Sequence, residues 1–225
     1  MKRAIAIDGP NGSGKSTIAR RIAQELGFAY VDTGALYRAI GLFCIESGAN
    51  PDKPGEVEAC LPRVSLSVKY EDNSQITYVN DRDASAEIRT QEAARAASKV
   101  ALVPKIRALV VETARGISAN EDVVMDGRDI GTVVLPHAGL KIYLDASLET
   151  RTRRRLGELM RDGRPAEYAV VMKEIEERDH RDSTRECAPL RVAEGAVVID
   201  SSHMSPEQVC GVIIEKWRGL GEAHG

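Results

Sequence analysis

The sequence predicts an α/β fold in which helices cover both faces of a mainly parallel sheet, with an antiparallel hairpin inserted. Two observations lead to this prediction. Short apolar segments alternate with helical patterns along most of the chain, which is typical of parallel sheets with a helix layer on each face. Between residues 64 and 79 the hydrophobic period changes to two, which indicates paired antiparallel strands.

The first part of the chain contains two strand and helix pairs followed by a loop. Each strand is a short apolar run, and each helix repeats its apolar residues at three- and four-residue spacing. Residues 47–55 are rich in Gly, Pro, Asn and Asp, which form turns. The predicted elements are strands at Ala4–Ile7 and Phe28–Val31, a helix from Lys15 that Gly27 ends, and a helix at Ala35–Glu46.

The rest of the chain begins with the hairpin and then returns to the alternation. Pro104 is expected to divide a long helical pattern, because proline is tolerated in the first turn of a helix but not in its interior. The predicted elements are hairpin strands at Val64–Tyr70 and Ile76–Val79 with a turn at Glu71–Ser74, helical residues 91–115, strands at Val123–Met125, Leu140–Leu144 and Val197–Ile199, and helices at Leu148–Arg161, Tyr168–Asp179 and Pro206–Trp217.

Composition excludes several classes of protein. With 225 residues, 43% hydrophobic and 29% charged, the chain has enough apolar side chains for one α/β domain with an insertion or two small domains, so disorder of the whole chain is excluded. A net charge of −3 argues against duplex nucleic acid as a partner. No apolar run approaches the ~18 residues of a membrane span, and the four cysteines are widely separated. We expect a cytoplasmic protein with reduced thiols, bound neither to polynucleotides nor to membranes.

Residues 9–16 match the pattern G-x-x-x-x-G-K-[ST] in full, between a predicted strand and a predicted helix. Glycines allow backbone N–H groups to surround phosphate oxygens at the start of a helix. Lys15 would bind the β- and γ-phosphates, and the Ser16 hydroxyl would bind Mg²⁺. The sequence therefore predicts a three-layer fold of the P-loop NTPase type that binds a nucleoside triphosphate with Mg²⁺.

Three classes of P-loop protein differ in what else their sequences must contain. A GTPase-type switch is expected to carry Asn-Lys-x-Asp late in the chain, and this motif is absent. A motor or helicase usually needs a longer chain and a basic track. A small-molecule kinase needs a second anion site that faces the first, together with a lid that excludes water.

Three segments could form that second site. Asp32–Arg38 and Asp126–Asp129 each follow a predicted strand, where open α/β sheets place their ligands. In Glu177–Arg185, the charged residues Arg178, Asp182 and Arg185 recur at helical spacing and could project from one face. A strand-end ion pair or a solvated helix with ion pairs would also explain the last two segments. Six arginines at positions 151–164 form a basic stretch, which is either a solvated face or a lid over polyphosphate.

Together these motifs resemble the bacterial cytidylate kinases, a branch of the nucleoside monophosphate kinases, over nearly the entire chain. The resemblance also includes Glu87–Glu92, Gly127–Val134 and Ala188–Leu190. It implies a kinase core at residues 1–47 and 91–225, with a short lid at about 150–165. Residues 48–90 would be an inserted monophosphate-binding domain that carries the hairpin.

The resemblance implies transfer of the ATP γ-phosphoryl group to CMP or dCMP, with Mg²⁺ accompanying ATP. Lys15, Arg128, Arg153 and Arg154 would be catalytic, the last two from the lid. The residues expected to bind ATP are Gly9, Pro10, Asn11, Gly12, Ser13, Gly14, Lys15, Ser16 and Thr17.

On the acceptor side, the resemblance assigns the phosphate to arginines 38, 128 and 185. It assigns cytosine to Ser98, Arg107 and Asp129, where Asp129 would accept from the exocyclic amine that uracil lacks. Arg178 and Asp182 would contact the sugar. The full set expected to bind CMP is Thr33, Tyr37, Arg38, Ser98, Arg107, Gly127, Arg128, Asp129, Arg178, Asp182 and Arg185.

Two other functions stay open at this point. One is a P-loop kinase with a different acceptor, such as UMP, AMP or shikimate. The other is a regulatory P-loop switch that acts through a partner protein. We expect a monomer, because a small kinase that closes around its substrates gains little from burying a moving surface.

Overall fold

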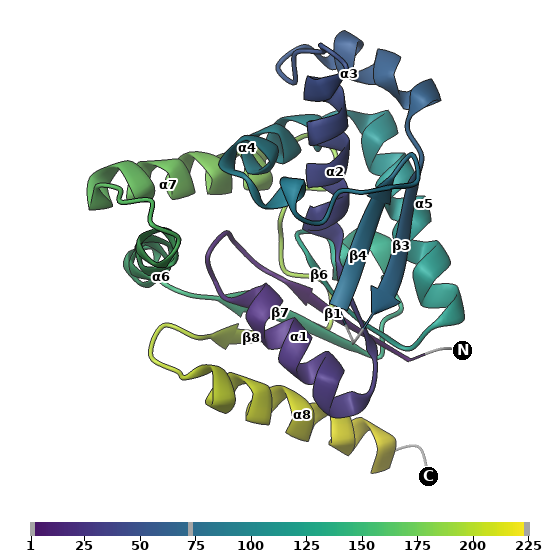
Figure 1. Cartoon of the computed structure of the whole chain (residues 1–225). Coiled ribbons are helices and arrows are strands. Elements are labelled where there is room, and N and C mark those ends of the chain that lie inside the picture. Colours follow the sequence, from purple (N-terminus) through teal and green to yellow (C-terminus); the bar gives the residue numbers. More distant parts are fainter. Residues whose placement is uncertain (1–2, 72–73, 223–225) are drawn as a thin grey trace.

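The computed structural model describes residues 3–71 and 74–222 (Figure 1). Its core is a sheet of five parallel strands in the order β2-β6-β1-β7-β8. This arrangement confirms the predicted α/β class with a central parallel sheet. The strands are β1 at Ala4–Asp8, β2 at Ala29–Asp32, β6 at Val123–Gly127, β7 at Leu140–Asp145 and β8 at Val197–Asp200.

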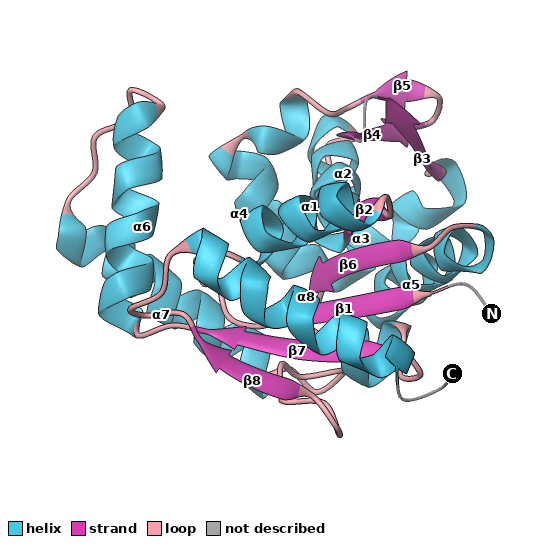
Figure 2. Cartoon of the chain, turned by 90° about the horizontal axis from the view of Figure 1, so that it is seen from below, coloured by secondary structure: helices cyan, strands magenta, loops and turns pink. Residues whose placement is uncertain are grey.

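Helices cover both faces of the core sheet, because side chains along each strand alternate between the two faces. Ile5 and Ile7 of β1 pack with Ile22 and Ile213, whereas Ala6 between them packs with Ala114. Helices α1 and α8 therefore lie on one face and α5 on the other (Figure 2). The helices are α1 at Lys15–Leu26, α2 at Thr33–Glu46, α3 at Pro54–Cys60, α4 at Gln91–Val100, α5 at Pro104–Asn120, α6 at Leu148–Arg161, α7 at Tyr168–Thr184 and α8 at Pro206–Glu222.

Residues 48–90 carry a second, antiparallel sheet in the order β3-β4-β5. It is separate from the core sheet in its strand pairing (Figure 2). It packs on α2, where Val79 and Ile88 contact Ala35 and Ala39. Of the predicted turn at Glu71–Ser74, residues 72 and 73 lie outside the described residues. The elements are β3 at Leu66–Glu71, β4 at Ser74–Val79, β5 at Arg82–Asp83, and 3-10 turns at Leu61–Arg63 and Glu87–Arg89.

Helices α6 and α7 form a pair at the side of the molecule (Figure 1). They share a small core of Leu159, Val171 and Ile175. The segment at 150–165 consists of most of α6 and the turn that follows it. Within residues 3–71 and 74–222, no helix is both long and apolar enough to cross a membrane.

Several boundaries differ from the sequence prediction. Helix α2 begins at Thr33 rather than Ala35, because the Asp32 carboxylate accepts a hydrogen bond from the Ala35 N–H and caps the helix there. Helix α3, which has Pro54 in its first turn, was not predicted. Helix α7 continues to Thr184, one and a half turns beyond the predicted end, and so includes Asp182.

Candidate active site

The glycine-rich loop joins β1 to α1, and two of its glycines are required by geometry. A Cβ on Gly9 would lie 2.0 Å from the carbonyl oxygen of Leu144 in β7, so a larger residue cannot fit. Gly14 has a φ of 94° at the start of α1, in the left-handed region that favours glycine. Among the described residues no side-chain hydrogen bond caps this helix, so its first N–H groups are available to an anion at the loop.

Lys15 is buried against this loop, with a side-chain ammonium that donates to the carbonyl of Pro10 at 2.6 Å. Burial lowers the pKa of Lys15 well below its usual value, and the neighbouring Arg128 lowers it further. A buried ammonium beside a second cation is an unfavourable arrangement that a polyphosphate would relieve.

Ser16, the next residue, faces a carboxylate at the end of β6. Its hydroxyl donates to Oδ2 of Asp126 at 2.9 Å, and the Tyr30 hydroxyl donates to Oδ1 at 2.8 Å. Burial and the nearby Asp32 raise the pKa of Asp126 to about 6. A hydroxyl beside a carboxylate at a P-loop is the donor set that holds Mg²⁺ in this class of site, so the residues fit the ion.

Two arginines of α6 brace the loop. Nη1 of Arg154 donates to the Ser13 carbonyl at 3.1 Å, and Nη1 of Arg151 donates to the Asn11 carbonyl at 3.1 Å. Arg151 also forms an ion pair with Asp179 of α7, which accepts from the Asn11 N–H at 3.2 Å. Helices α6 and α7 are thus attached to the loop through the backbone N–H and carbonyl of Asn11.

Arg153, which was expected beside ATP, is not brought to the loop. Its side chain is 69% exposed and pairs with Glu149 one turn earlier in α6. The sequence predicted Arg151 only as part of the basic stretch, and it did not predict the role of Asp179.

A second group of cations lies near Lys15, at the carboxyl ends of β2 and β6 and on α7. Arg38 pairs with Asp32 at 2.7 Å, and Arg128 pairs with Asp182 at 2.8 Å. The Nε of Arg178, by contrast, is buried without a hydrogen-bond partner among the described residues. Burial and then Arg128 lower the pKa of Arg178 to about 10. A group of half-buried arginines, one of which has an unsatisfied Nε, is typical of a binding site for an anion.

The residues expected to bind the base form a third group next to these cations. Asp129 pairs with Arg107, and with Arg185 at 3.5 Å. The Arg107 guanidinium lies 5.9 Å from the ring centre of Tyr37. Ser98 of α4, also buried, accepts a hydrogen bond at 3.2 Å from Arg181, a residue not predicted.

The carboxylate of Asp8 binds the backbone directly after Asp129. Its two carboxylate oxygens accept from the N–H groups of Ile130 and Gly131 at 2.8 and 2.7 Å. These residues begin a one-turn π-helix at Ile130–Val134, a feature that often occurs at functional sites. Asp8 directly precedes the glycine-rich loop, so one buried carboxylate connects that loop with the residues that follow Asp129.

Gly127 and Thr33 show how closely the strand ends pack. The Thr33 hydroxyl donates to the Asp126 carbonyl at 2.8 Å, and a Cβ on Gly127 would lie 2.6 Å from that hydroxyl oxygen. A side chain at position 127 would therefore displace Thr33 from its place at the start of α2.

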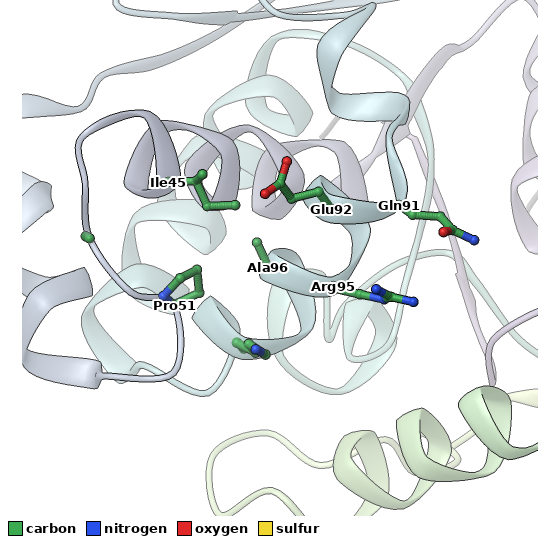
Figure 3. Close-up of a pocket in the computed structure, with 8 residues that line it drawn as sticks. Ile45, Pro51, Gln91, Glu92, Arg95 and Ala96 are labelled. Carbon is green, nitrogen blue, oxygen red and sulfur yellow. The ribbon is translucent and has the colours of Figure 1, made fainter.

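A separate pocket of about 580 Å³ lies between the end of α2, the loop after it and α4 (Figure 3). Ile45, Pro51, Glu92 and Arg95 are among its lining residues. No residue predicted to bind a substrate lines it, so it takes no part in the site described above.

The fold and the glycine-rich loop together define a P-loop protein, with a group of arginines beside the loop. Comparison with known proteins then assigns the family. A family model described as "Cytidylate kinase" matches residues 5–219. The chain belongs to the cytidylate kinase family, which confirms the resemblance found in the sequence.

Individual relatives agree with this assignment. The cytidylate kinase of Caldicellulosiruptor bescii is 42% identical over 211 residues, covering 94% of this chain and 93% of its own length. That of Parabacteroides distasonis is 42% identical and covers 96% of each chain. A solved structure of an uncharacterized protein from Eubacterium ventriosum has a TM-score of 0.54 at 14% identity, covering 96% of this chain and 98% of its own. That likeness supports the fold alone.

Proposed function

We propose that the chain is an enzyme that transfers the γ-phosphoryl group of ATP to CMP or dCMP, giving ADP and CDP or dCDP. The single observation that carries this proposal is the Nε of Arg178, which is buried without a hydrogen-bond partner among the described residues and lies near Arg38 and Arg128 beside the loop of Lys15. A P-loop switch needs only one anion site, whereas a phosphotransferase needs two that face each other. Membership of the cytidylate kinase family favours the cytidine nucleotide over UMP, AMP or shikimate.

On the donor side, the backbone of residues 9–17 would surround the ATP phosphates. Lys15 would exchange its bond to the Pro10 carbonyl for the β- and γ-phosphates. Arg154, which already contacts the loop at Ser13, would approach the same phosphates from α6. Asn11, held from both sides by Arg151 and Asp179, keeps the loop in place for the incoming anion.

On the acceptor side, Arg38, Arg128 and Arg185 would bind the 5′-phosphate. Arg178 and Asp182, with Thr33, would contact the sugar. Asp129 would accept a hydrogen bond from the exocyclic amine of cytosine, with Ser98 and Arg107 beside it. Uracil presents a carbonyl at that position, so it would place an acceptor against a buried carboxylate.

Ser16 and Asp126 are the residues that would hold Mg²⁺ with ATP. The bound ion supplies positive charge to the β- and γ-phosphate oxygens. Phosphoryl transfer depends on in-line positioning and charge neutralisation more than on a strong base, so the arginines and Lys15 suffice for the protein's part.

We further propose that residues 48–90 form the monophosphate-binding domain and that residues 150–165 act as the lid. Movement of both toward the core would exclude water from the transferring group. We also propose that the enzyme works as a monomer in the cytoplasm, without polynucleotide or membrane partners.

An assay of ADP release across a panel of acceptors tests the function. CMP and dCMP should give the two highest kcat/KM values, with UMP, AMP and shikimate well below them. A higher value for any of those three would contradict the proposed substrate. Slow hydrolysis with no dependence on acceptor, together with a nucleotide-dependent protein complex, would instead favour a regulatory switch.

A further inference from the structure

Gln75 lies on the buried face of an inserted strand. Residues 75, 77 and 79 of β4 share one face, because side chains alternate along a strand. Thr77 and Val79 are buried there, and Gln75 is half-buried beside them. Polar groups on a buried face need hydrogen-bond partners. The partners of Gln75 and Thr77 therefore show which part of the core this strand contacts.

The side-chain amide of Gln75 binds the backbone of Asp32 at both of its polar groups. Its Oε1 accepts from the Asp32 N–H at 2.7 Å, and its Nε2 donates to the Asp32 carbonyl at 3.3 Å. The same Nε2 donates to the Thr77 hydroxyl at 3.1 Å, which fixes the orientation of the amide. Because β2 is an outer strand of the core sheet, the amide takes the place of a missing neighbouring strand at this residue.

Asp32 in turn holds the acceptor side of the site. Its carboxylate accepts from the Ala35 N–H at 3.0 Å and from Nη2 of Arg38 at 2.7 Å. The first bond caps α2, and the second directs the Arg38 guanidinium. A single residue is thus held through its backbone by the inserted domain, while its side chain holds an arginine of the acceptor site.

We propose that Gln75 is a positioning residue for the acceptor phosphate. It fixes Asp32, and Asp32 presents Arg38, so the position of the inserted hairpin is coupled to binding of the acceptor. Within residues 3–71 and 74–222, the side-chain hydrogen bonds of Gln75 go to Asp32 and Thr77 and to none of residues 9–17, so we expect little effect on the donor side. This inference rests on the proposed function, because it takes CMP as the acceptor.

The first test is the variant Gln75→Met, which keeps the length of the side chain and removes both hydrogen bonds to Asp32. The KM for CMP should rise about fivefold, the effect of losing one modest hydrogen-bonded contact, while the KM for ATP stays within about twofold. Arg82→Ala is the matched control. Arg82 lies in β5 of the same sheet, and the change removes its exposed ion pairs to Glu46 and Glu87 without touching Asp32, so both KM values should stay near wild type.

A double variant tests whether the effect passes through Arg38. In the Arg38→Met background, adding Gln75→Met should raise the KM for CMP no further, because residues that act in series are not additive. An unchanged KM for CMP in Gln75→Met, an equal rise for CMP and ATP, or fully additive effects would each overturn the proposal.

Hydrogen exchange in the wild-type protein tests the same coupling and does not require that a variant folds. Saturating CMP should slow hydrogen exchange of the Asp32 amide, whose proton is donated to Gln75, by more than ATP does. Equal slowing by both nucleotides, or none by CMP, would overturn the coupling. Failure of the wild-type chain to phosphorylate CMP or dCMP would contradict the proposed function instead, so the two failures are distinguishable.

Discussion

The Ser16 hydroxyl donates a hydrogen bond of 2.9 Å to the carboxylate of Asp126, which joins the first turn of α1 to the end of β6. The residues are 110 positions apart in the sequence. Their contact places an oxygen pair at the base of the glycine-rich loop, where the charge of a triphosphate and its ion would be concentrated.

Asp126→Asn should raise the Mg²⁺ concentration needed for half-maximal activity by about tenfold, because an amide oxygen carries no charge for the ion. A titration of Mg²⁺ at saturating ATP and CMP measures this. Tyr30→Phe removes the other partner of Asp126 and keeps Ser16, so its shift should be smaller. An unchanged Mg²⁺ requirement in Asp126→Asn would exclude this role.

Lys15→Ala should lower kcat by about 10²- to 10³-fold, the usual loss when a preorganised charge at a transition state is removed. Because burial lowers the pKa of this lysine, its charge is unfavourable in the folded chain, and the variant should unfold no more readily than wild type. ADP release and thermal unfolding measure the two effects. A loss below tenfold in kcat would contradict the role of Lys15.

Arg154→Ala should raise the KM for ATP about tenfold, since this arginine contacts the loop at Ser13. Arg153→Ala is the matched variant one position earlier and should stay within twofold of wild type, because Arg153 is exposed and pairs with Glu149. Initial rates at varied ATP compare them. A larger effect of Arg153→Ala than of Arg154→Ala would show instead that α6 rotates when ATP binds and brings Arg153 to the phosphates.

Asp129→Asn should reduce the preference for CMP over UMP, measured as the ratio of the two kcat/KM values, by about tenfold or more. The asparagine amide can turn to donate to the uracil carbonyl, whereas the carboxylate can only accept. Asp129 also pairs with Arg107 and Arg185, so thermal unfolding of the variant must accompany the assay. An unchanged ratio in a folded variant would remove Asp129 from base selection.

Asp8→Asn should change how stability depends on pH. Burial raises the pKa of Asp8 from 3.8 to about 6, so the folded chain binds this proton more tightly than the unfolded chain. The contribution of Asp8 to stability is then greatest in acid and is lost as the pH rises through about 6. Relative to the variant, wild type should gain about 1.4 kcal/mol between pH 7.5 and pH 5.

Urea unfolding of both proteins at the two pH values measures this difference. Other titrating carboxylates change stability equally in both proteins, so they cancel in the comparison. A difference that is the same at pH 5 and pH 7.5 would show that the pKa of Asp8 is not raised.

Much of the core could be predicted from the sequence, because its signals are local. Short apolar runs predicted the strands, and the glycine spacing before Lys15 predicted a phosphate-binding loop within eight consecutive residues. The start of α2 was placed two residues late because the capping contact of Asp32 leaves no hydrophobic signal. Helix α3 was missed because its seven residues are too few for a clear period.

The candidate site was only partly predictable. The run Arg151 to Arg155 contains four arginines, and successive residues turn by about 100° around a helix. Packing of α6 on α7 determines that Arg151 and Arg154 face the loop while Arg153 faces solvent. The role of Gln75 depends likewise on where the inserted hairpin meets the edge of β2.

By itself, then, the sequence determined the class of fold, the nucleotide-binding loop and the residue types available for a second anion site. These follow from periodicity and from short motifs, which depend on interactions between near neighbours. Only the tertiary structure decided which charges meet. It paired Ser16 with Asp126, left the Nε of Arg178 without a hydrogen-bond partner among the described residues and placed Gln75 on Asp32. These outcomes are not local, because contacts between distant residues depend on how the helices and strands pack against one another.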